Sequence, residues 1–473
     1  MTNNDIVQKL WNLCDVLRDD GINYSDYVTE MVLLLFIKMV HENTEAGTLE
    51  NHPLPKGCRW TDLNGKSGIN LLNDYKRILL SLSTGKDGDG KLVHDDPLIS
   101  AIYADAQTRL REPRHLEQMI KTLDQIDWFS AQKDGLGDLY DLTSVQKAFQ
   151  STRAYEGIEL VPGTRRLALM NCLLHGMEGG SEGVVQLGNA LGLAGSSLAP
   201  AEVILANPPF GTSKGGDASI TRDDLTYKTS NKQLAFLQHI YRNLKPGGRA
   251  AVVLPDNVLF EAGVGTDVRR DLMNKCNLHT ILRLPTGIFY AQGVKTNVLF
   301  FTKGSAADKF QEENCTENVW VYDLRTNMPN FGKRTPFGDS HLKPFEALYG
   351  DNPNGLSPRT EGDWSFNAEQ IETAETDENQ NVDDRLAHSR WRVFSRDWIR
   401  DHKSDSLDIS WLRDKDSVDA ANLPEPSVLA GEAMTELVQA LGELDALMRE
   451  LGAGDEADGA RVLLKDVMGE IEQ

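Results

Sequence analysis

Apolar residues at the start of the chain follow a helical spacing. They recur three and four positions apart, at Ile6, Leu10, Leu13, Cys14 and Leu17. This spacing predicts an amphipathic helix, which Asn3 or Asn4 can cap. Further helices are predicted for residues 25–40 and 114–126, separated by a glycine-rich loop at 85–90. In the second helix the expected inward positions are Tyr27, Met31, Leu34, Leu35 and Met39.

From about residue 155 the pattern changes to short apolar runs between helical stretches. The predicted helices cover residues 164–175, 233–244 and 267–274. The predicted strands cover residues 156–160, 183–187, 202–206, 249–255, 278–284 and 295–303. Strands that alternate with helices are typical of βαβ units. The fold class is therefore α/β, with a doubly wound, Rossmann-like sheet after a helical N-terminal domain.

The pattern weakens after residue 305 and becomes helical again near the end. Residues 305–425 are rich in turn formers and read as irregular, although Trp364, Trp391 and Trp398 suggest that parts of them pack on a core. Residues 427–468 have leucines near heptad spacing, which fits either a helix packed on its own domain or an assembly helix. The predicted domains are 1–135, helical; 136–425, α/β and interrupted near 140–156; and 426–473, a C-terminal helical segment.

Composition narrows the class of protein. The net charge is −22, which argues against autonomous DNA binding, because phosphate affinity requires clustered Lys and Arg. The five cysteines are scattered without a Cys-x-x-Cys pair, so neither a metal site nor a disulfide framework is expected. The chain begins without a signal-like run and contains no apolar stretch of membrane length. We expect a cytoplasmic protein without a membrane association.

One motif predicts a catalytic function. Asn207-Pro208-Pro209-Phe210 follows the apolar run 203–206, at a predicted strand end, where open α/β sheets bind ligands. The Asn207 amide oxygen and the Pro208 carbonyl can accept the two hydrogens of an amino group, whose delocalised lone pair makes it a poor nucleophile. Phe210 offers a face on which an extruded base can stack. The motif predicts methyl transfer from a sulfonium donor; the alternative is a rigid turn after a strand.

Other candidates are less specific. Glu159 ends a predicted strand and fits a carboxylate that binds ribose hydroxyls, and Asn189 follows the next strand, where it could contact the adenine of the donor. Phe289 could hold a flipped base or pack in the core. Five basic residues could contact phosphates, although a solvated helix face explains most of them: Lys228, Lys232, Arg269, Arg270 and Lys275.

Four segments resemble the modification (methyltransferase) subunit of type I DNA restriction-modification systems: residues 160–171, 207–210, 246–257 and 284–297. Residues 9–14 and 404–411 resemble it too, so the resemblance covers nearly the whole chain. It implies transfer of a methyl group from S-adenosylmethionine to adenine N6 in double-stranded DNA. It also implies a complex of two modification subunits with a specificity subunit, which reads the DNA. This complex is able to bind a restriction subunit.

The chain departs from this family at one place. The resemblance implies a first strand and a glycine-rich cofactor loop before Glu159, yet no glycine lies between Gly137 and Gly157. Residues 138–156 are too few for a helix, a strand and that loop. Either the chain has an internal deletion or a segment is left out of the sequence. A real deletion predicts weak or no binding of the donor and a sheet that lacks its central strand.

Three functions follow from these observations. The first is a DNA adenine methyltransferase subunit that acts with a specificity subunit. The second is a non-catalytic interaction subunit without the cofactor loop. The third, methylation of RNA or of a protein glutamine, also uses Asn-Pro-Pro motifs, but the family-like ends of the chain disfavour it.

Overall fold

A computed structural model describes residues 3–412 except 24–25, 127, 129–143, 210–219, 290–293, 330, 333–334 and 362–388, together with a few positions between 434 and 458. The expected C-terminal helical segment therefore lies almost entirely outside the described residues, as do Phe210 and Trp364. None of the helices in the described part is long and apolar enough to span a membrane. The same part holds no cluster of three or more His, Cys, Asp or Glu side chains suited to a metal ion.

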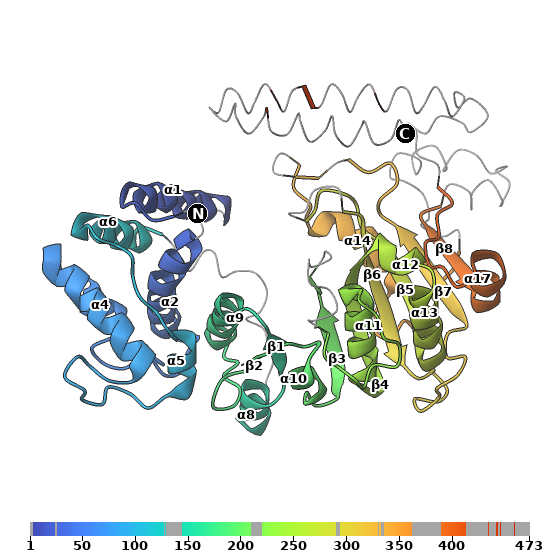
Figure 1. Ribbon diagram of the computed structural model, residues 1–473, viewed down its shortest axis with the longest axis horizontal. Coiled ribbons are helices and arrows are strands. Elements are labelled where there is room, and N and C mark those ends of the chain that lie inside the picture. The colour runs from blue at the N-terminus through green and yellow to red at the C-terminus, as the bar shows by residue number, and fades with distance from the viewer. Residues whose placement is uncertain are drawn as a thin grey trace. The chain divides into compact units, whose positions relative to one another are not determined.

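The N-terminal region is helical, as predicted (Figure 1). Its helices are α1 (Asn3–Asp19), α2 (Tyr27–Glu45), α3 (Trp60–Leu63), α4 (Gly68–Thr84), α5 (Pro97–Ile102) and α6 (Pro113–Asp124). The predicted stripe on α1 is correct, because Ile6, Leu13, Cys14 and Leu17 are buried. The predicted face of α2 is partly wrong. Its fully buried residues include Leu33, Phe36, Ile37 and Val40, whereas Met31, Leu35 and Met39 are only partly buried.

A small parallel sheet follows this region. It contains β1 (Gly157–Glu159) and β2 (Val185–Leu187), which are joined by α9 (Pro162–Leu174) and preceded by α8 (Ser144–Thr152). The buried face of α9 packs into the core of the N-terminal helices through Leu169, Met170 and Leu173. This core therefore extends past residue 135, where the sequence analysis places a domain boundary.

A second sheet contains the remaining six strands. They are β3 (Ala201–Ala206), β4 (Leu244–Pro255), β5 (Cys276–Arg283), β6 (Thr296–Lys303), β7 (Asn318–Asp323) and β8 (Trp391–Ser395), in the spatial order β3-β4-β6-β5-β7-β8. The pairs β3–β4 and β5–β7 are parallel, and the other pairs are antiparallel. The carboxyl ends of β3, β4, β5 and β7 thus lie at one edge, together with the first residues of β6.

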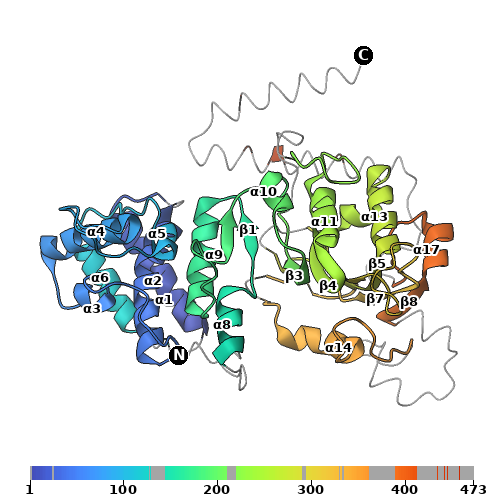
Figure 2. The ribbon, with the colours of Figure 1, turned by 90° about the horizontal axis from the view of Figure 1, so that it is seen from below.

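Helices cover both faces of this six-stranded sheet. Figure 2 shows α11 (Lys232–Arg242) and α13 (Val264–Lys275) on one face and α14 (Asp339–Tyr349) on the other. Phe345 and Leu348 of α14 pack on Leu282, Tyr322 and Trp391. Three short helices complete the described elements: α10 (Leu193–Ser196), α12 (Asp256–Phe260) and α17 (Arg396–Lys403). Helices on both faces of a mixed sheet make a doubly wound α/β fold, as predicted.

The description of residues 305–425 as irregular is wrong in part. This region supplies β7 and β8, whose register pairs Trp320 with Val393. Trp391 is fully buried and stacks on Trp320, with ring centroids 5.0 Å apart, so the expectation that tryptophans anchor this region is correct for Trp391. The pattern did not predict these strands because 67 residues separate them in the chain.

Candidate functional site

The Asn-Pro-Pro motif begins where β3 ends. Ala206 is the last residue of β3 and lies opposite Val252 of β4, and Asn207 is the first residue beyond it. The Asn207 side chain is exposed, Pro208 is buried and Pro209 is exposed. A buried proline fixes the backbone of the loop while the preceding amide stays accessible. The predicted location, beyond the carboxyl end of a strand in an open sheet, is therefore correct.

A partly buried arginine, Arg325, makes most of the side-chain contacts at the same edge of the six-stranded sheet. The Arg325 guanidinium donates to both carboxylate oxygens of Asp256, at 2.7 and 3.0 Å. It also donates to the Thr296 carbonyl at 2.7 Å, to Asn297 Oδ1 at 3.2 Å and to the Leu284 carbonyl at 2.9 Å. One side chain thereby joins the ends of β4 and β5 to the start of β6. Planar bidentate pairing of this kind is specific to arginine.

The Arg325 side chain is itself held in place. The backbone N–H groups of Arg325 and Thr326 both donate to Asp323 Oδ1 at 2.8 Å, and Asp323 is completely buried at the end of β7. Arg283 of β5 donates to the other oxygen of Asp323 at 3.1 Å. We call Arg325, Asp256 and Asn297 the strand-end clamp. Because β4 is next to β3, the clamp supports the edge from which Asn207 projects.

The strand-end clamp was not among the residues predicted from the sequence. Asp256 and Asn297 lie inside segments 246–257 and 284–297, which were noted for their resemblance, and each adjoins a strand end. A carboxylate or an amide at the end of a strand could thus have indicated Asp256 and Asn297 from the sequence. Arg325 could not be found in this way, because its partners lie 28 to 69 residues away in the chain.

Glu159 and Asn189 share the carboxyl edge of the small sheet. Glu159 ends β1, and its backbone carbonyl accepts a hydrogen bond from Gly188 at 3.0 Å, immediately after β2. Its carboxylate accepts from the Val161 N–H at 2.7 Å, and Asn189 Oδ1 accepts from the Leu191 N–H at 2.9 Å. The structure therefore brings these two predicted residues together. Asn207 belongs to the other sheet, and no strand pairing among the described residues joins the two sheets.

These residues fit one part of S-adenosylmethionine. A carboxylate at the end of a parallel strand suits the ribose hydroxyls, and Glu159 is only half-buried there, within reach of a ligand. The methionine part of the donor requires close approach of the backbone, which a glycine-rich loop allows. Of the residues before β1, those described from 144 onward form α8 and its connection to the strand, without a glycine. Among the described residues, Glu159 and Asn189 are therefore suited to the ribose and adenine of the donor, and those from 144 to β1 offer no glycine for its methionine part.

Three of the candidate phosphate contacts have structural partners. Arg269 is 1% exposed and donates to the carbonyls of Asp405 and Val258, at 2.8 and 3.0 Å. Burial lowers the pKa of Arg269 to about 10. Arg270 pairs with Asp405 at 2.9 Å and Lys275 with Asp271 at 2.9 Å. Both interpretations of Arg269, a phosphate contact and a solvated helix face, are therefore wrong.

Phe289 lies in the core rather than in an open site. It packs, partly buried, against the cluster of Leu282, Leu284 and Trp391. The core-packing alternative therefore explains its position.

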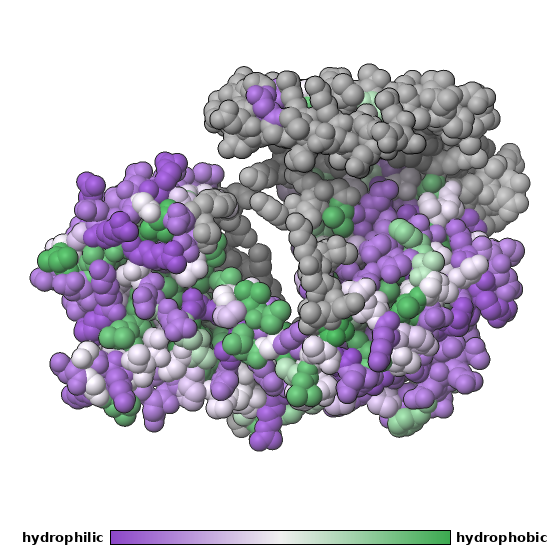
Figure 3. All heavy atoms as spheres, in the orientation of Figure 1, coloured by the Kyte–Doolittle hydropathy of each residue, from purple (hydrophilic) through white to green (hydrophobic). Residues whose placement is uncertain are grey.

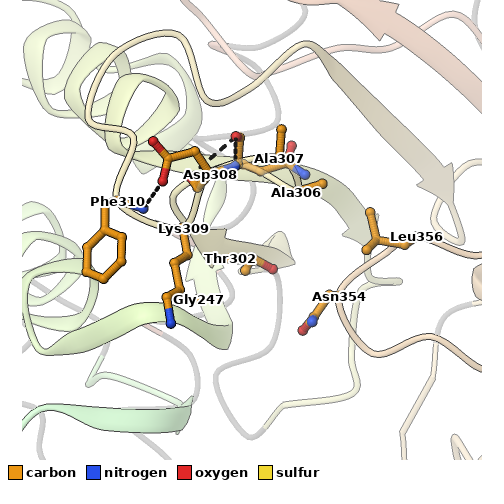
Figure 4. Close-up of a pocket in the computed structure, with 11 residues that line it drawn as sticks. Gly247, Thr302, Ala306, Ala307, Asp308, Lys309, Phe310, Asn354 and Leu356 are labelled. Carbon is orange, nitrogen blue, oxygen red and sulfur yellow. Dashed lines mark hydrogen bonds between the residues drawn. The ribbon is translucent and has the colours of Figure 1, made fainter.

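A cavity of about 480 Å³ lies at the opposite edge of the six-stranded sheet. Figure 4 shows Gly247, Thr302 and the loop 306–310 around it, and Gly247 and Asn277 lie near the amino ends of β4 and β5. Asp308 is occupied within its own loop, because it accepts from the Phe310 N–H at 2.9 Å. The cavity thus lies away from Asn207 and takes no part in the motif's chemistry.

The fold and the edge residues together define a class of protein. A doubly wound sheet with an accessible amide and a proline carbonyl beyond a strand is the arrangement of a methyltransferase that acts on an amino group. The model of the N-6 DNA Methylase family matches residues 138–393, and that of the HsdM N-terminal domain matches 6–123. The model of the C-terminal domain of type I restriction enzyme methylase subunits matches 423–466. The chain belongs to the N-6 DNA methylases, as a methylase subunit of the type I restriction enzymes.

Individual relatives agree with this assignment. The chain is 51% identical to the EcoKI methylase subunit of Escherichia coli K12 and 50% identical to the StySJI methylase subunit of Salmonella typhimurium, and each alignment covers all of both chains. The crystal structure of the EcoKI M protein aligns with 98% of this chain and 99% of its own, with a TM-score of 0.56. This chain is therefore similar to complete methylase subunits.

The alignment with the EcoKI methylase subunit is also longer than this chain. It runs over 545 positions, whereas this chain has 473 residues, so at least 72 positions have no residue of this chain. A single βαβ unit needs about 30 residues or more. The absent positions are thus enough for the strand, helix and loop that the resemblance implies.

Proposed function

We propose that this chain transfers a methyl group from S-adenosylmethionine to adenine N6 in double-stranded DNA, within a complex that contains its specificity subunit. The observation that carries the proposal is the position of Asn207 and Pro208 beyond β3. There the Asn207 amide oxygen and the Pro208 carbonyl accept the two N6 hydrogens of an extruded adenine. These acceptors draw the nitrogen toward tetrahedral geometry and make its lone pair available.

The remaining predicted residues complete this site. Phe210 provides the stacking face for the base, Glu159 holds the ribose of the donor and Asn189 contacts its adenine. S-adenosylmethionine, when bound, would supply the methyl group: the N6–carbon bond forms as the carbon–sulfur bond breaks, S-adenosylhomocysteine leaves, and one N6 proton passes to solvent. The catalytic contribution of the protein is to position the two reactants, a term that can lower a barrier by several kcal/mol.

Partner subunits complete the DNA-binding function. The acidic charge of −22 cannot supply sequence-independent phosphate affinity, so this affinity comes from a basic specificity subunit, which also reads the target sequence. The complex contains a second copy of this chain and is able to bind a restriction subunit. The match of residues 423–466 to a C-terminal domain of type I methylase subunits supports an assembly role for that segment.

The direct test is methyl transfer by the assembled complex. DNA with and without the target sequence is incubated with labelled S-adenosylmethionine, the chain and its specificity subunit. Asn207→Ala lowers the transfer rate by about 100- to 1,000-fold, the range for loss of one oriented hydrogen-bonding group at a reacting centre. Asn73→Ala, an exposed asparagine on α4, is the matched control and retains the full rate. Equal rates for the two variants contradict the role of Asn207.

A second candidate function is that of a non-catalytic subunit that binds the specificity subunit but not the donor. The 72 or more absent positions favour it. Titration of S-adenosylmethionine into the purified 52.5 kDa chain separates the candidates. Micromolar binding supports the methyltransferase. Absence of binding, together with retained capture of the specificity subunit, supports the interaction subunit.

A further inference from the structure

The cavity near the amino ends of β4 and β5 has a floor made by two strands. Thr302 of β6 lies opposite Asn277 of β5 in the antiparallel register, so their side chains share one face of the sheet. Phe300 lies two residues before Thr302 and therefore on the same face. Its ring packs against Phe345 and Tyr349 of α14, with ring centroids 5.8 and 5.3 Å apart. The floor of the cavity thus belongs to the face that α14 covers, and not to the face that carries α11 and α13.

Two loops form the walls of the cavity, and a glycine lets each of them pack closely. The loop 305–310 turns back on Gly304, where an added Cβ would lie 2.3 Å from the Lys309 carbonyl oxygen. The loop after α14 lies against His279, and a Cβ on Gly355 would lie 2.3 Å from the His279 Nδ1 atom. Both glycines have positive φ angles, 77° and 72°. The two walls are therefore held against the sheet at defined positions.

Two buried oxygen atoms in the lining of this cavity lack a hydrogen-bond partner. The Thr302 side chain is only 9% exposed, and its Oγ1 bonds to none of the described residues. Asn354 Oδ1, in the loop after α14, is likewise buried and unpaired within the described part of the chain. Most buried polar atoms in proteins are paired, and an unpaired one calls for an explanation. Because both residues line the cavity, a bound molecule can supply these hydrogen bonds.

A cation and several apolar groups complete the lining. The Lys309 ammonium lies 5.2 Å from the centroid of the Phe310 ring, and it forms no ion pair with any described residue. The Phe310 side chain is 67% exposed, and that of Leu356 on the other wall is 53% exposed. Figure 4 shows Lys309 and Asn354 on opposite sides of Thr302. The cavity thus offers a positive charge at one end, hydrogen-bonding groups at its floor and other end, and apolar surfaces beside them.

We propose that this cavity binds a nucleoside monophosphate whose base carries an amino group. The phosphate pairs with the Lys309 ammonium, and the edge of the base bonds to Thr302 and Asn354, whose Oδ1 accepts from the amino group. Leu356 and the Phe310 ring provide the apolar contacts that the faces of a planar base require. The volume of about 480 Å³ lies within the range of small-molecule sites. A sugar phosphate would pair with Lys309 but would leave these apolar side chains uncovered.

This site is separate from the one that we propose for methyl transfer. It lies near the amino ends of β4 and β5, whereas Asn207 follows the carboxyl end of β3 and Glu159 ends β1. The inference does not depend on the methyltransferase reaction, so either proposal can fail while the other holds. Cytidine monophosphate is the probe, because its base carries an amino group but differs from the adenine of the methyl donor. Its binding therefore does not report on the donor site.

The test is isothermal titration calorimetry with the full chain. Cytidine monophosphate is expected to bind with a dissociation constant in the micromolar range. Uridine monophosphate has a carbonyl oxygen in place of the amino group, and this oxygen cannot donate to Asn354 Oδ1. It is therefore expected to bind about tenfold more weakly, which corresponds to the loss of one hydrogen bond. Ribose phosphate, which lacks the base, is expected to bind more weakly than either nucleotide.

Two substitutions place the binding in this cavity. Lys309→Ala removes the exposed cation and is expected to raise the dissociation constant about tenfold or more. Thr302→Val keeps the shape of the side chain but removes its hydroxyl, and it is also expected to weaken binding. Because this hydroxyl has no partner in the free protein, the melting temperature of the Thr302→Val variant is expected not to fall. Lys121→Ala, an exposed lysine of α6, is the matched control and retains full affinity.

The outcomes decide between a nucleotide site and its alternatives. Weaker binding in both variants, with the Lys121→Ala control unchanged and uridine monophosphate disfavoured, supports the proposal. Absence of cytidine monophosphate binding to the folded chain overturns it. Equal affinity for ribose phosphate or for uridine monophosphate overturns the placement of the base, and binding that neither substitution weakens shows that the nucleotide binds elsewhere on the chain.

Discussion

The carboxyl edges of the two sheets differ in how firmly their side chains are held. At the edge of the six-stranded sheet, Arg325 joins Asp256, Asn297 and two backbone carbonyls. At the edge of the small sheet, Glu159 and Asn189 each bond to the backbone two residues further along the chain, and the strands are three residues long. We assign the edge of the six-stranded sheet to the target base, and its hydrogen bonds join residues that are far apart in the chain. We assign the edge of the small sheet to the methyl donor, and its hydrogen bonds join residues that are close together in the chain.

This difference shows that the two edges are stabilised in different ways. The strand-end clamp uses only residues at the ends of β4 to β7, so it does not depend on the small sheet, whose apolar surface Figure 3 shows in the lower middle of the view. The residues assigned to the donor lie on a two-stranded sheet, and sheets of this size have little stability of their own. Here α9 ties that sheet to the N-terminal core. Four measurements can break or sharpen this contrast.

The largest effect is expected from Arg325→Ala. It leaves the partly buried Asp256 carboxylate without its bidentate partner and removes several hydrogen bonds, and each hydrogen bond to a charged group contributes about 1.5–3 kcal/mol. Thermal unfolding is expected to show a large loss of stability in the six-stranded unit, with hydrogen exchange in α1 to α6 little changed. The control is Arg400→Ala, which removes exposed pairs with Asp397 and Asp401 and is expected to leave the unfolding transition almost unchanged, because solvent screens exposed ion pairs. Equal losses in the two variants would refute the clamp.

A smaller loss of stability is expected when the pH is lowered. Burial, with Arg359 nearby, lowers the pKa of His279 on β5 to about 3, whereas an unfolded histidine titrates near 6.5. The folded chain keeps His279 neutral, so its contribution is fully present above pH 6.5 and is lost as the pH falls toward 3. Between pH 6.5 and pH 4 the loss is roughly 2–3 kcal/mol. We expect unfolding of the His279→Asn variant to depend less on pH over this range, and a parallel dependence would contradict the assignment.

Glu159→Gln tests the donor edge and is expected to have a moderate effect. The substitution removes the charge that we propose to accept the ribose hydroxyls while it retains an oxygen for the Val161 N–H. In the complex with the specificity subunit the dissociation constant of S-adenosylmethionine is expected to rise about tenfold, or roughly 1.4 kcal/mol. Glu156→Gln, on the exposed segment before β1, serves as the control. An unchanged dissociation constant would remove Glu159 from the site.

The smallest effect on stability is expected from Leu205→Ser. An exposed leucine has little burial to lose, so stability is expected to change by less than about 0.5 kcal/mol. Leu299→Ala on the central strand β6 provides the contrast, because Leu299 is fully buried and its truncation costs about 2–5 kcal/mol. A cost for Leu205→Ser similar to that of Leu299→Ala would show that β3 is already covered in solution.

Much of the fold could be predicted because its signals are local. The helical stripe of α1, the helix α9 and the strand β3 with its Asn-Pro-Pro end were all expected within a few residues of their observed bounds. Each depends on side chains close together in the chain, where period and turn chemistry suffice. β7 and β8 were missed, since their short runs acquire meaning only when they pair across a long connection.

The sequence by itself determined the class of the protein, the position of the Asn-Pro-Pro motif at a strand end and the lack of a glycine-rich loop before Glu159. Only the tertiary structure decided that Arg269 is a buried structural residue, that Arg325 holds three strand ends together and that the strands form two sheets with an exposed apolar edge at β3. The physical reason is the separation, along the chain, of the residues that interact. A sequence motif or a hydrophobic periodicity depends on residues that are close together in the chain. Ion pairs, burial and strand order depend on which distant segments pack against one another.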